Sequence, residues 1–215
     1  MKTGGRYDTS GLAEARSEPG SRGRVLRNRL GITRKREMDA AEYNAYNAAI
    51  VSLLKSYGPE HRFTASDIQK MHRLWLGGIY EWSGEYRQVN VSKGGFFFAA
   101  SGQIPLLMAE FEKGPLSRHT PCAFKDMPRV IEALAEVHVE LLLIHPFREG
   151  NGRLARLLSV LMGTQAGLPL LDFSCIRGKK KEEYFAAVRA GLDRDYKPME
   201  RIFELVIDTA LKASC

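Results

Sequence analysis

Apolar side chains recur at three- and four-residue intervals along most of the chain, which is the spacing of amphipathic helices. The first such segment runs through residues 38–54, and Gly58-Pro59 ends it because proline cannot continue a helix. A second helix is predicted to follow Thr64, which can form a capping box with Asp67. Further helices are predicted over residues 103–113, 127–144, 152–166, 179–195 and 198–213.

One stretch departs from the helical pattern. Tyr86, Val89 and Val91 favour a strand, residues 92–95 favour a turn, and the three phenylalanines at 96–98 favour a return strand. This hairpin is the only β segment that the pattern predicts, and no internal repeat is visible. The predicted fold class is therefore all-α, mainly helical, with one small β-hairpin.

The N-terminal residues differ from the remainder in composition. Residues 1–24 are rich in Gly, Ser and Arg and show no apolar period, which predicts a basic, flexible N-terminal arm ahead of a single domain over residues 25–215. Residues 1–37 hold ten Lys and Arg against four Asp and Glu, most of the net charge of +7. Basic arms can contact nucleic acid, but Tyr7 is the only aromatic residue here, so a solvated leader is favoured over a nucleic-acid partner.

Other features of the composition exclude several protein classes. The chain has no run of about 18 apolar residues and no apolar segment near its start, so neither a membrane span nor a secretory signal is expected. Its three cysteines, Cys122, Cys175 and Cys215, are far apart and form no C-x-x-C pair, so neither a disulfide framework nor a zinc site is indicated. The expected location is a reducing cytoplasm.

The most informative stretch is "IHPFREGNGRLARLL", residues 144–158, which separates two strongly apolar predicted helices. His145 ends the first helix because Pro146 prevents simple continuation, and Phe147 is an apolar anchor for the loop. The two glycines around Asn151 let the backbone turn with its N–H groups exposed, and a helix begins at once. Free N–H groups and the positive end of a helix dipole favour an anion at this point.

The charged residues of this stretch sharpen the prediction. Arg153 and Arg156 are three positions apart, so both can project from the first turn, and guanidinium groups suit phosphate oxygens. Glu149 would repel a phosphate unless a cation joined them, as magnesium does with one carboxylate and substrate phosphates. The residues therefore predict a magnesium-bound polyphosphate with His145 beside it. The structural alternative is that His145 caps the helix and the arginines pair with Glu149. That alternative does not explain why so many polar groups lie between two strongly apolar helices.

This stretch resembles a known family. His145 to Arg156 match the signature of Fic domains, H-x-F-x-[D/E]-G-N-G-R-x-x-R, at every fixed position. The hairpin "VNVSKGGFFFA" upstream and "LDFS" and "KKKEEYFAAVRAGLDRDYKPM" downstream also look like bacterial Fic proteins, so the resemblance covers about residues 25–205. It implies the Fic fold, a helical bundle around a helix-loop-helix active site with the hairpin as a flap.

The resemblance implies an activity as well. Fic domains usually transfer AMP from ATP to a Tyr, Ser or Thr hydroxyl of a target protein. By similarity, His145 would be the general base, a role that an imidazole titrating near neutral pH suits. Glu149 would hold Mg²⁺ between the α- and β-phosphates.

The remaining motif residues would bind the nucleotide. By similarity, backbone N–H groups around Gly150, Asn151 and Gly152 would surround the phosphates, and the Asn151 side chain would contact the α-phosphate. Arg153 and Arg156 would balance the charge of the β- and γ-phosphates. Catalysis would rest mainly on positioning and electrostatics.

Gly152 bears on which group is transferred. In the Doc branch of the superfamily a Lys replaces this glycine and ATP binds reversed, which gives a kinase, so Gly152 favours AMP transfer. Other Fic relatives transfer phosphocholine or remove AMP, and a non-catalytic nucleotide-binding module also fits the motif.

The hairpin is the expected docking element for the target. By similarity, the flap residues Ser92, Lys93, Gly94, Gly95 and Phe96 would hold a target segment by strand pairing. Alternation along the strand points one of the three phenylalanines the opposite way, so Phe97 fits the core and the clamp equally well.

Regulation and target remain expectations of the resemblance. Many Fic enzymes carry an inhibitory [S/T]-x-x-x-E-[G/N] helix whose Glu pairs with the second motif arginine, here Arg156. Residues 33–37 have the T-x-x-x-E spacing, but Met38 replaces Gly or Asn and three basic residues intervene between Thr33 and Glu37. The favoured reading is inhibition by a separate small antitoxin protein. Toxin-like members often modify ATPase subunits of type II topoisomerases, which makes such a subunit a candidate target.

Overall fold

Two buried helices form the centre of the molecule, and the chain between them carries the motif. The computed structural model describes residues 11–214, and the central helices are α5, Met127–Ile144, and α6, Asn151–Gln165. Their bounds agree with the predicted helices to within one residue, because each has a long run of apolar positions and a clear end signal. Most of their side chains are buried, so the loop at 145–150 is fixed at both ends to the core.

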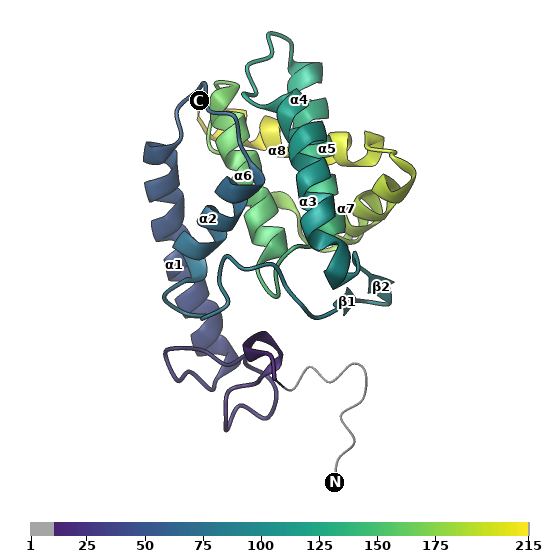
Figure 1. The fold of residues 1–215 in the computed structure, drawn as a ribbon. Coiled ribbons are helices and arrows are strands. Elements are labelled where there is room, and N and C mark those ends of the chain that lie inside the picture. The colour runs from purple at the N-terminus through teal and green to yellow at the C-terminus, as the bar shows by residue number, and fades with distance from the viewer. Residues whose placement is uncertain (1–10, 215) are drawn as a thin grey trace.

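Other helices cover this pair on two sides (Figure 1). α1, Lys35–Ser56, and α2, Ala65–Leu76, pack on each other and on α6. α7, Lys179–Ala190, and α8, Lys197–Ala213, pack on each other and on α5. α3, Ile104–Phe111, lies along α5 and continues through a π-helical turn, Glu112–Leu116, into the short α4, Ser117–His119. Short 3-10 turns occur at Ala13–Ala15, Ser101–Gln103, Phe173–Cys175 and Gly191–Asp193.

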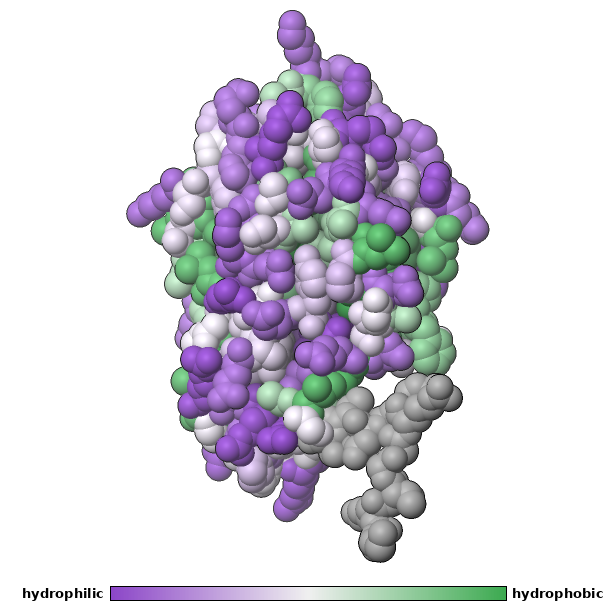
Figure 2. Space-filling view, viewed as in Figure 1, coloured by the Kyte–Doolittle hydropathy of each residue, from purple (hydrophilic) through white to green (hydrophobic). Residues whose placement is uncertain are grey.

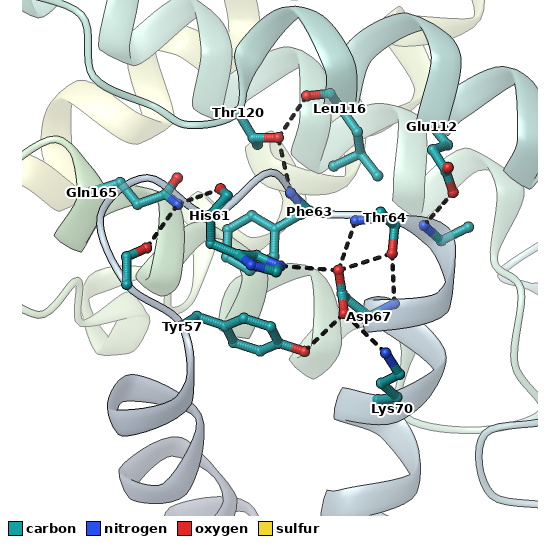
Figure 3. Close-up of polar contacts among 12 residues, drawn as sticks. Tyr57, His61, Phe63, Thr64, Asp67, Lys70, Glu112, Leu116, Thr120 and Gln165 are labelled. Atoms are coloured by element: carbon teal, nitrogen blue, oxygen red, sulfur yellow. Dashed lines mark hydrogen bonds and ion pairs between the residues drawn. The ribbon is translucent and has the colours of Figure 1, made fainter.

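The start of α2 is fixed by the predicted capping box. Thr64 Oγ1 accepts a hydrogen bond from the Asp67 N–H at 3.1 Å, and the Asp67 carboxylate accepts one from the Thr64 N–H at 3.0 Å. Tyr57 and His61 also contact this carboxylate, so the end of α1 and the start of α2 share one acceptor (Figure 3). Burial alone would raise the pKa of Asp67, but the hydrogen bonds from Thr64 and His61 outweigh it and lower the pKa.

The predicted hairpin is present but shorter than its sequence pattern. β1, Ser92–Lys93, pairs antiparallel with β2, Phe96–Phe97, in the register Ser92 to Phe97 and Lys93 to Phe96. Ser92 and Lys93 therefore belong to a strand, and the turn consists of Gly94 and Gly95 alone, both with positive φ. A two-residue hairpin turn needs that conformation at both positions, which glycine adopts at little steric cost.

Residues 11–24, which lie in the segment predicted to be a flexible arm, contact the rest of the domain at several points. Glu14 is buried, and its carboxylate accepts a hydrogen bond from the Gln88 N–H at 2.6 Å. Arg148 Nε donates to the Glu14 carbonyl at 3.1 Å, and an antiparallel bridge joins Ser17 to Leu26. The sequence of this segment has no repeating apolar face. Isolated polar contacts attach it to the domain instead. Residues 1–10, with Tyr7 among them, lie outside the described residues.

The surface fits the sequence composition. The face seen in Figure 2 is mostly hydrophilic, with hydrophobic residues scattered among the polar ones. Among the described residues, 11–214, no helix has both the length and the apolar character needed to cross a membrane.

Candidate active site

The motif forms the predicted helix-loop-helix. His145 is the C-cap of α5 in the left-handed conformation, with φ of 53°, and its N–H still donates to the Leu141 carbonyl. Gly150, with φ of 86°, is the N-cap of α6. Two left-handed residues thus frame the loop, and α6 begins with its free N–H groups at the loop.

His145 has the protonation state of a base. Its Nδ1 lies 3.1 Å from the Leu142 carbonyl oxygen, an acceptor, so Nδ1 carries the proton and Nε2 has a free lone pair. The ring stacks on Phe98 of the flap at a centroid distance of 3.6 Å. Burial above all, with a smaller contribution from the positive charges of Arg87 and Lys93, lowers the pKa of His145 to about 4 against the opposing hydrogen bond to Leu142. The imidazole is therefore neutral at pH 7.

A buried arginine that the sequence analysis did not single out holds His145 in position. Arg87 Nε donates to the His145 carbonyl at 2.7 Å, and its Nη atoms donate to the carbonyls of Val89 and Ala99 at 2.7 and 2.6 Å. The Arg87 N–H also donates to Pro146 at 2.9 Å. One side chain therefore joins the end of α5 to both sides of the flap.

Two further contacts fix the loop itself. The Asn151 side chain accepts from the Phe147 N–H at 2.9 Å and donates to the Phe147 carbonyl at 2.7 Å. Both ends of this amide are therefore bonded within the loop, which fixes its orientation in the cavity wall, and the expected Asn151 contact to a phosphate stays a prediction.

His72, on α2, supports the same loop from outside the motif. The Gly84 N–H donates to His72 Nδ1 at 2.8 Å, so Nε2 carries the proton and donates to the Glu149 carbonyl at 3.1 Å. The ring also stacks on Phe147 at 4.0 Å. Burial lowers the pKa of His72 to about 4, which keeps this donor and acceptor arrangement intact at neutral pH.

Glu149 is the one motif carboxylate. Its Oε1 accepts from the Gly150 N–H at 3.0 Å and lies 3.4 Å from Arg153 Nη2. The Gly150 N–H is thus bonded within the motif, while the side chain of Glu149 remains 45% exposed. No group of three or more His, Cys, Asp or Glu side chains that could hold a metal ion occurs within residues 11–214.

Arg153 is held by a buried carboxylate from α1. Its Nη2 lies 2.6 Å from Glu42 Oε2, and its guanidinium lies over the Trp75 ring at 4.6 Å. Glu42 also accepts the Tyr80 hydroxyl at 2.6 Å, and its main-chain carbonyl accepts the Trp75 indole N–H at 2.9 Å. Nothing in the motif points to Glu42, because it lies 111 residues earlier in the chain.

Arg156 lies among aromatic rings. Its guanidinium is 5.9 Å from the ring centroid of Phe173 and 5.8 Å from that of Tyr184 on α7. No carboxylate within residues 11–214 is at ion-pair distance from it. Arg156 is thus charged, partly exposed and without a neutralising partner in the described part of the chain.

These side chains surround one cavity of about 480 Å³, a size that accepts a nucleotide. All seven predicted motif residues line it: His145, Glu149, Gly150, Asn151, Gly152, Arg153 and Arg156. Of the predicted flap residues, Ser92 and Lys93 line it together with Phe98, whereas Gly94, Gly95 and Phe96 do not. The opposite wall comes from α7, whose lining residues are Lys181, Tyr184, Phe185 and Val188.

The two motif glycines have different reasons to be glycine. A Cβ on Gly150 would lie 2.7 Å from a ring carbon of Trp75, and its φ is positive. A Cβ on Gly152 would meet nothing within 4 Å, so packing within the described residues does not require glycine there. The open space next to Gly152 belongs to the cavity.

Comparison with known proteins agrees with this geometry. Residues 62–162 match the model described as the Fic/DOC family, a segment that contains the flap, α5 and most of α6. The segment that holds the motif is therefore similar to the Fic/DOC family.

Similar proteins include the protein adenylyltransferase Fic of Drosophila ananassae and that of Drosophila melanogaster, each 29% identical over 195 residues. These alignments cover 90% of this chain but only 36% and 37% of the two relatives, so the chain spans about a third of their length.

Similar solved structures include the BepC protein of Bartonella tribocorum with bound AMPPNP, with a TM-score of 0.71, 22% identity and coverage of 91% of this chain and 97% of that one. The N-terminal Fic domain of a Bartonella quintana effector with bound ADP aligns with a TM-score of 0.67, 24% identity and coverage of 84% and 89%. The fold is therefore the Fic fold, mainly helical with a small hairpin, as the sequence predicted.

Proposed function

We propose that this protein is an adenylyltransferase that transfers AMP from ATP to a hydroxyl group of a target protein and releases pyrophosphate. The observation that carries the proposal is a neutral His145, with a free Nε2, that lines one cavity with the N-terminus of α6 and both motif arginines. The names of the Drosophila relatives and the nucleotides bound in the Bartonella structures support it.

The chemistry follows from these positions. His145 Nε2 accepts the proton of the target hydroxyl, and the hydroxyl oxygen forms a bond to the α-phosphorus of ATP as the bond to the β-phosphate oxygen breaks. The N-terminus of α6 and the arginines, chiefly Arg156, stabilise the negative charge that the leaving pyrophosphate acquires. The pKa of His145 near 4 makes it a weak base that is always in its neutral form at pH 7. Positioning and electrostatics are therefore expected to supply most of the rate acceleration.

Glu149 fits the role of a magnesium ligand. Its side chain lines the cavity and is nearly half exposed, and one of its two oxygens has no bonded partner within residues 11–214. A single carboxylate suits Mg²⁺, which takes its other ligands from substrate phosphates and water. When bound, the ion would balance the charge of the polyphosphate.

The flap is the proposed docking element for the target. Phe98 faces His145, whereas Phe97 is 78% exposed, so alternation turns Phe97 away from the cavity. The exposed ring and the exposed strand residues Ser92 and Lys93 offer a target segment an apolar contact and main-chain hydrogen-bonding groups.

The test is a labelling experiment. Incubation with α-labelled ATP, Mg²⁺ and a bacterial lysate should label a protein band, and His145→Ala should abolish the label while it retains the thermal stability and ATP affinity of the wild type. Label from γ-labelled ATP would instead show a kinase. The mass added to the acceptor residue separates AMP from phosphocholine, and ATP binding without any transfer would indicate a non-catalytic nucleotide-binding module.

Inhibition by a separate antitoxin is also part of the proposal. Glu37 lies on the surface and pairs with Arg34 at 3.4 Å, which leaves the Thr33–Glu37 segment without a contact to Arg156. The absence of a carboxylate beside Arg156 within residues 11–214 supports a partner that supplies one. Expression of the chain alone should then arrest a bacterial host, and normal growth with intact ATP turnover would contradict this.

A bacterial cytoplasmic target, with a type II topoisomerase ATPase subunit as the first candidate, follows from the same toxin-like assignment. Mass spectrometry of the labelled band tests the identity of the target and of its modified residue.

A further inference from the structure

A second cavity, of about 380 Å³, adjoins the first at the start of the flap. Its lining residues come from the N-terminal segment, the flap strand and the motif loop: Ala15, Val89, Asn90, Val91, Ser92 and Arg148. The last three also line the first cavity, so the two cavities meet at the flap. The proposed reaction gives the second cavity no occupant.

Arg148 brings a positive charge to this second cavity from a fixed position. Its Nε donates to the Glu14 carbonyl at 3.1 Å, which ties the guanidinium to the N-terminal segment. The buried carboxylate of Glu14 is used elsewhere, because it accepts the Gln88 N–H at 2.6 Å. Among residues 11–214, no carboxylate lies at ion-pair distance from Arg148. Its charge and its two Nη groups are therefore available to a ligand.

The other polar side chains that line the second cavity can also donate hydrogen bonds. Asn90 Oδ1 accepts the Ser101 N–H at 2.8 Å, which leaves the NH₂ group of the same amide for another partner. Ser92 is exposed, and its hydroxyl has no partner within residues 11–214. A guanidinium, an amide NH₂ and a hydroxyl, with no carboxylate on the cavity wall, suit an anion, and the planar guanidinium matches the two oxygens of a carboxylate.

We infer that the second cavity binds the carboxylate of an Asp or Glu side chain of the target, two residues from the hydroxyl that receives AMP. Along an extended strand, side chains two residues apart point the same way and lie about 7 Å from each other. A target segment that pairs with the flap and places its hydroxyl at His145 therefore presents that second side chain to the adjoining cavity. The inference rests on the proposed function, because it assigns a sequence preference to the same transfer. Arg148 is then a specificity-determining residue that acts on the target rather than on ATP.

The first test reads the sequence around the modified residue. A bacterial lysate is labelled with α-labelled ATP and Mg²⁺, and mass spectrometry identifies the acceptor residue of the labelled protein. An Asp or Glu should stand two residues before or two residues after that acceptor. An acceptor with neither overturns the inference and leaves the proposed function intact. A lysate in which no protein is labelled contradicts the proposed function, and the inference fails with it.

Steady-state kinetics with the identified target test the contact itself. Arg148→Gln should raise the KM for the target about 10-fold, while kcat and the KM for ATP stay within about 2-fold of the wild type. Arg148→Lys keeps the charge and should recover part of the loss. Arg201→Gln is the matched control, because Arg201 is an exposed arginine on α8 that lines neither cavity. An unchanged KM for the target in Arg148→Gln, or a rise confined to the KM for ATP, would overturn the inference.

Reversal of the charge on both partners separates a direct contact from an effect on the fold. Arg148→Glu should lower kcat/KM for the natural target, and a target whose acidic residue is replaced by Lys should restore part of it. The same Lys-substituted target should be a poor substrate of the wild type. If Arg148 served only to hold the N-terminal segment through Glu14, Arg148→Glu would lower the thermal stability and no change in the target would restore activity. That result would overturn the inference.

Discussion

Arg153 and Arg156 reach the same cavity from one helix, α6, but they are held by different neighbours, Arg153 by α1 and α2 and Arg156 by Phe173 and α7. Arg153 is bonded to the buried carboxylate of Glu42 at 2.6 Å and lies over Trp75, both from the α1 and α2 side. Arg156 lies against the aromatic rings of Phe173 and Tyr184 on the α7 side. One arginine is largely neutralised before a ligand arrives, whereas the other presents its whole charge.

The motif contains both arginines, but this difference in partners gives Arg153 and Arg156 separate roles. Because Glu42 already balances Arg153, this arginine joins α1 to α6 and adds little net attraction for an anion. Arg156 supplies the uncompensated positive charge that a polyphosphate needs. Each side also contains one buried neutral histidine, His72 on the first and His138 on the second.

The largest expected effect comes from acidification, which should lower the free energy of unfolding through buried histidines on both sides of the cavity. The folded-state pKa values of His72 and His138, about 4 and about 3, lie below the usual value of 6.5, so between these values the unfolded chain binds more protons. Stability is therefore full above about pH 6.5 and falls as the pH decreases, by about 2 kcal/mol from each histidine at pH 5.

Urea denaturation at pH 7, 6 and 5 measures this loss. His72→Gln should show a shallower pH dependence because one of the three buried histidines with a lowered pKa, His72, His138 and His145, no longer titrates. An unfolding free energy that is flat over this range would contradict the neutral state of both histidines.

The second effect tests the α1 and α2 side through Gly150. Gly150→Ala places a methyl group 2.7 Å from the Trp75 ring at a positive φ, so the helix start and the ring that carries Arg153 cannot both keep their positions. We expect a loss of about 3 kcal/mol in the free energy of unfolding, from overpacking and backbone strain together. Thermal and chemical denaturation measure it. A variant as stable as the wild type would show that Trp75 and the start of α6 can shift apart at little cost in free energy.

The third effect compares how much stability each arginine provides. Glu42→Gln leaves Arg153 without its buried partner and should lower stability by about 2 kcal/mol, since Arg153 is one-third exposed and part of the loss is screened. Arg156→Gln should change stability by about 0.5 kcal/mol or less, because no ion pair is broken within residues 11–214. It should nevertheless lose at least about 10-fold in ATP affinity. Equal destabilisation by the two variants would remove the distinction between the two sides.

The smallest effect on stability is expected at Gly152, which lies between the two sides. Gly152→Ala meets no atom within 4 Å, and alanine favours a helix, so stability should be unchanged or rise by up to ~1 kcal/mol. AMP transfer should still fall because the new methyl group enters the cavity next to the proposed phosphate site. Stability and labelling of this variant, measured beside Gly150→Ala, show which glycine serves the fold and which serves the ligand.

The sequence by itself determined the parts of this protein that depend on neighbouring residues. The apolar spacing predicted α5 and α6 to within a residue, Thr64 and Asp67 predicted the capping box, and the motif predicted the turn before α6. Seven motif residues were expected at one site, and all seven line one cavity. Helix periodicity, caps and turns are local interactions, so a short window of sequence contains them.

Only the tertiary structure decided which distant side chains control the motif. Glu42 bonds Arg153 across 111 residues, His72 bonds Glu149 across 77, Arg87 bonds His145 across 58, and Tyr184 bonds His138 across 46. Each pair depends on how α1, α2, the flap and α7 pack around the central helices, and no spacing pattern specifies that packing. A motif can therefore identify the groups that meet a phosphate, while the charge and orientation of those groups are set by residues that become neighbours only in the folded chain.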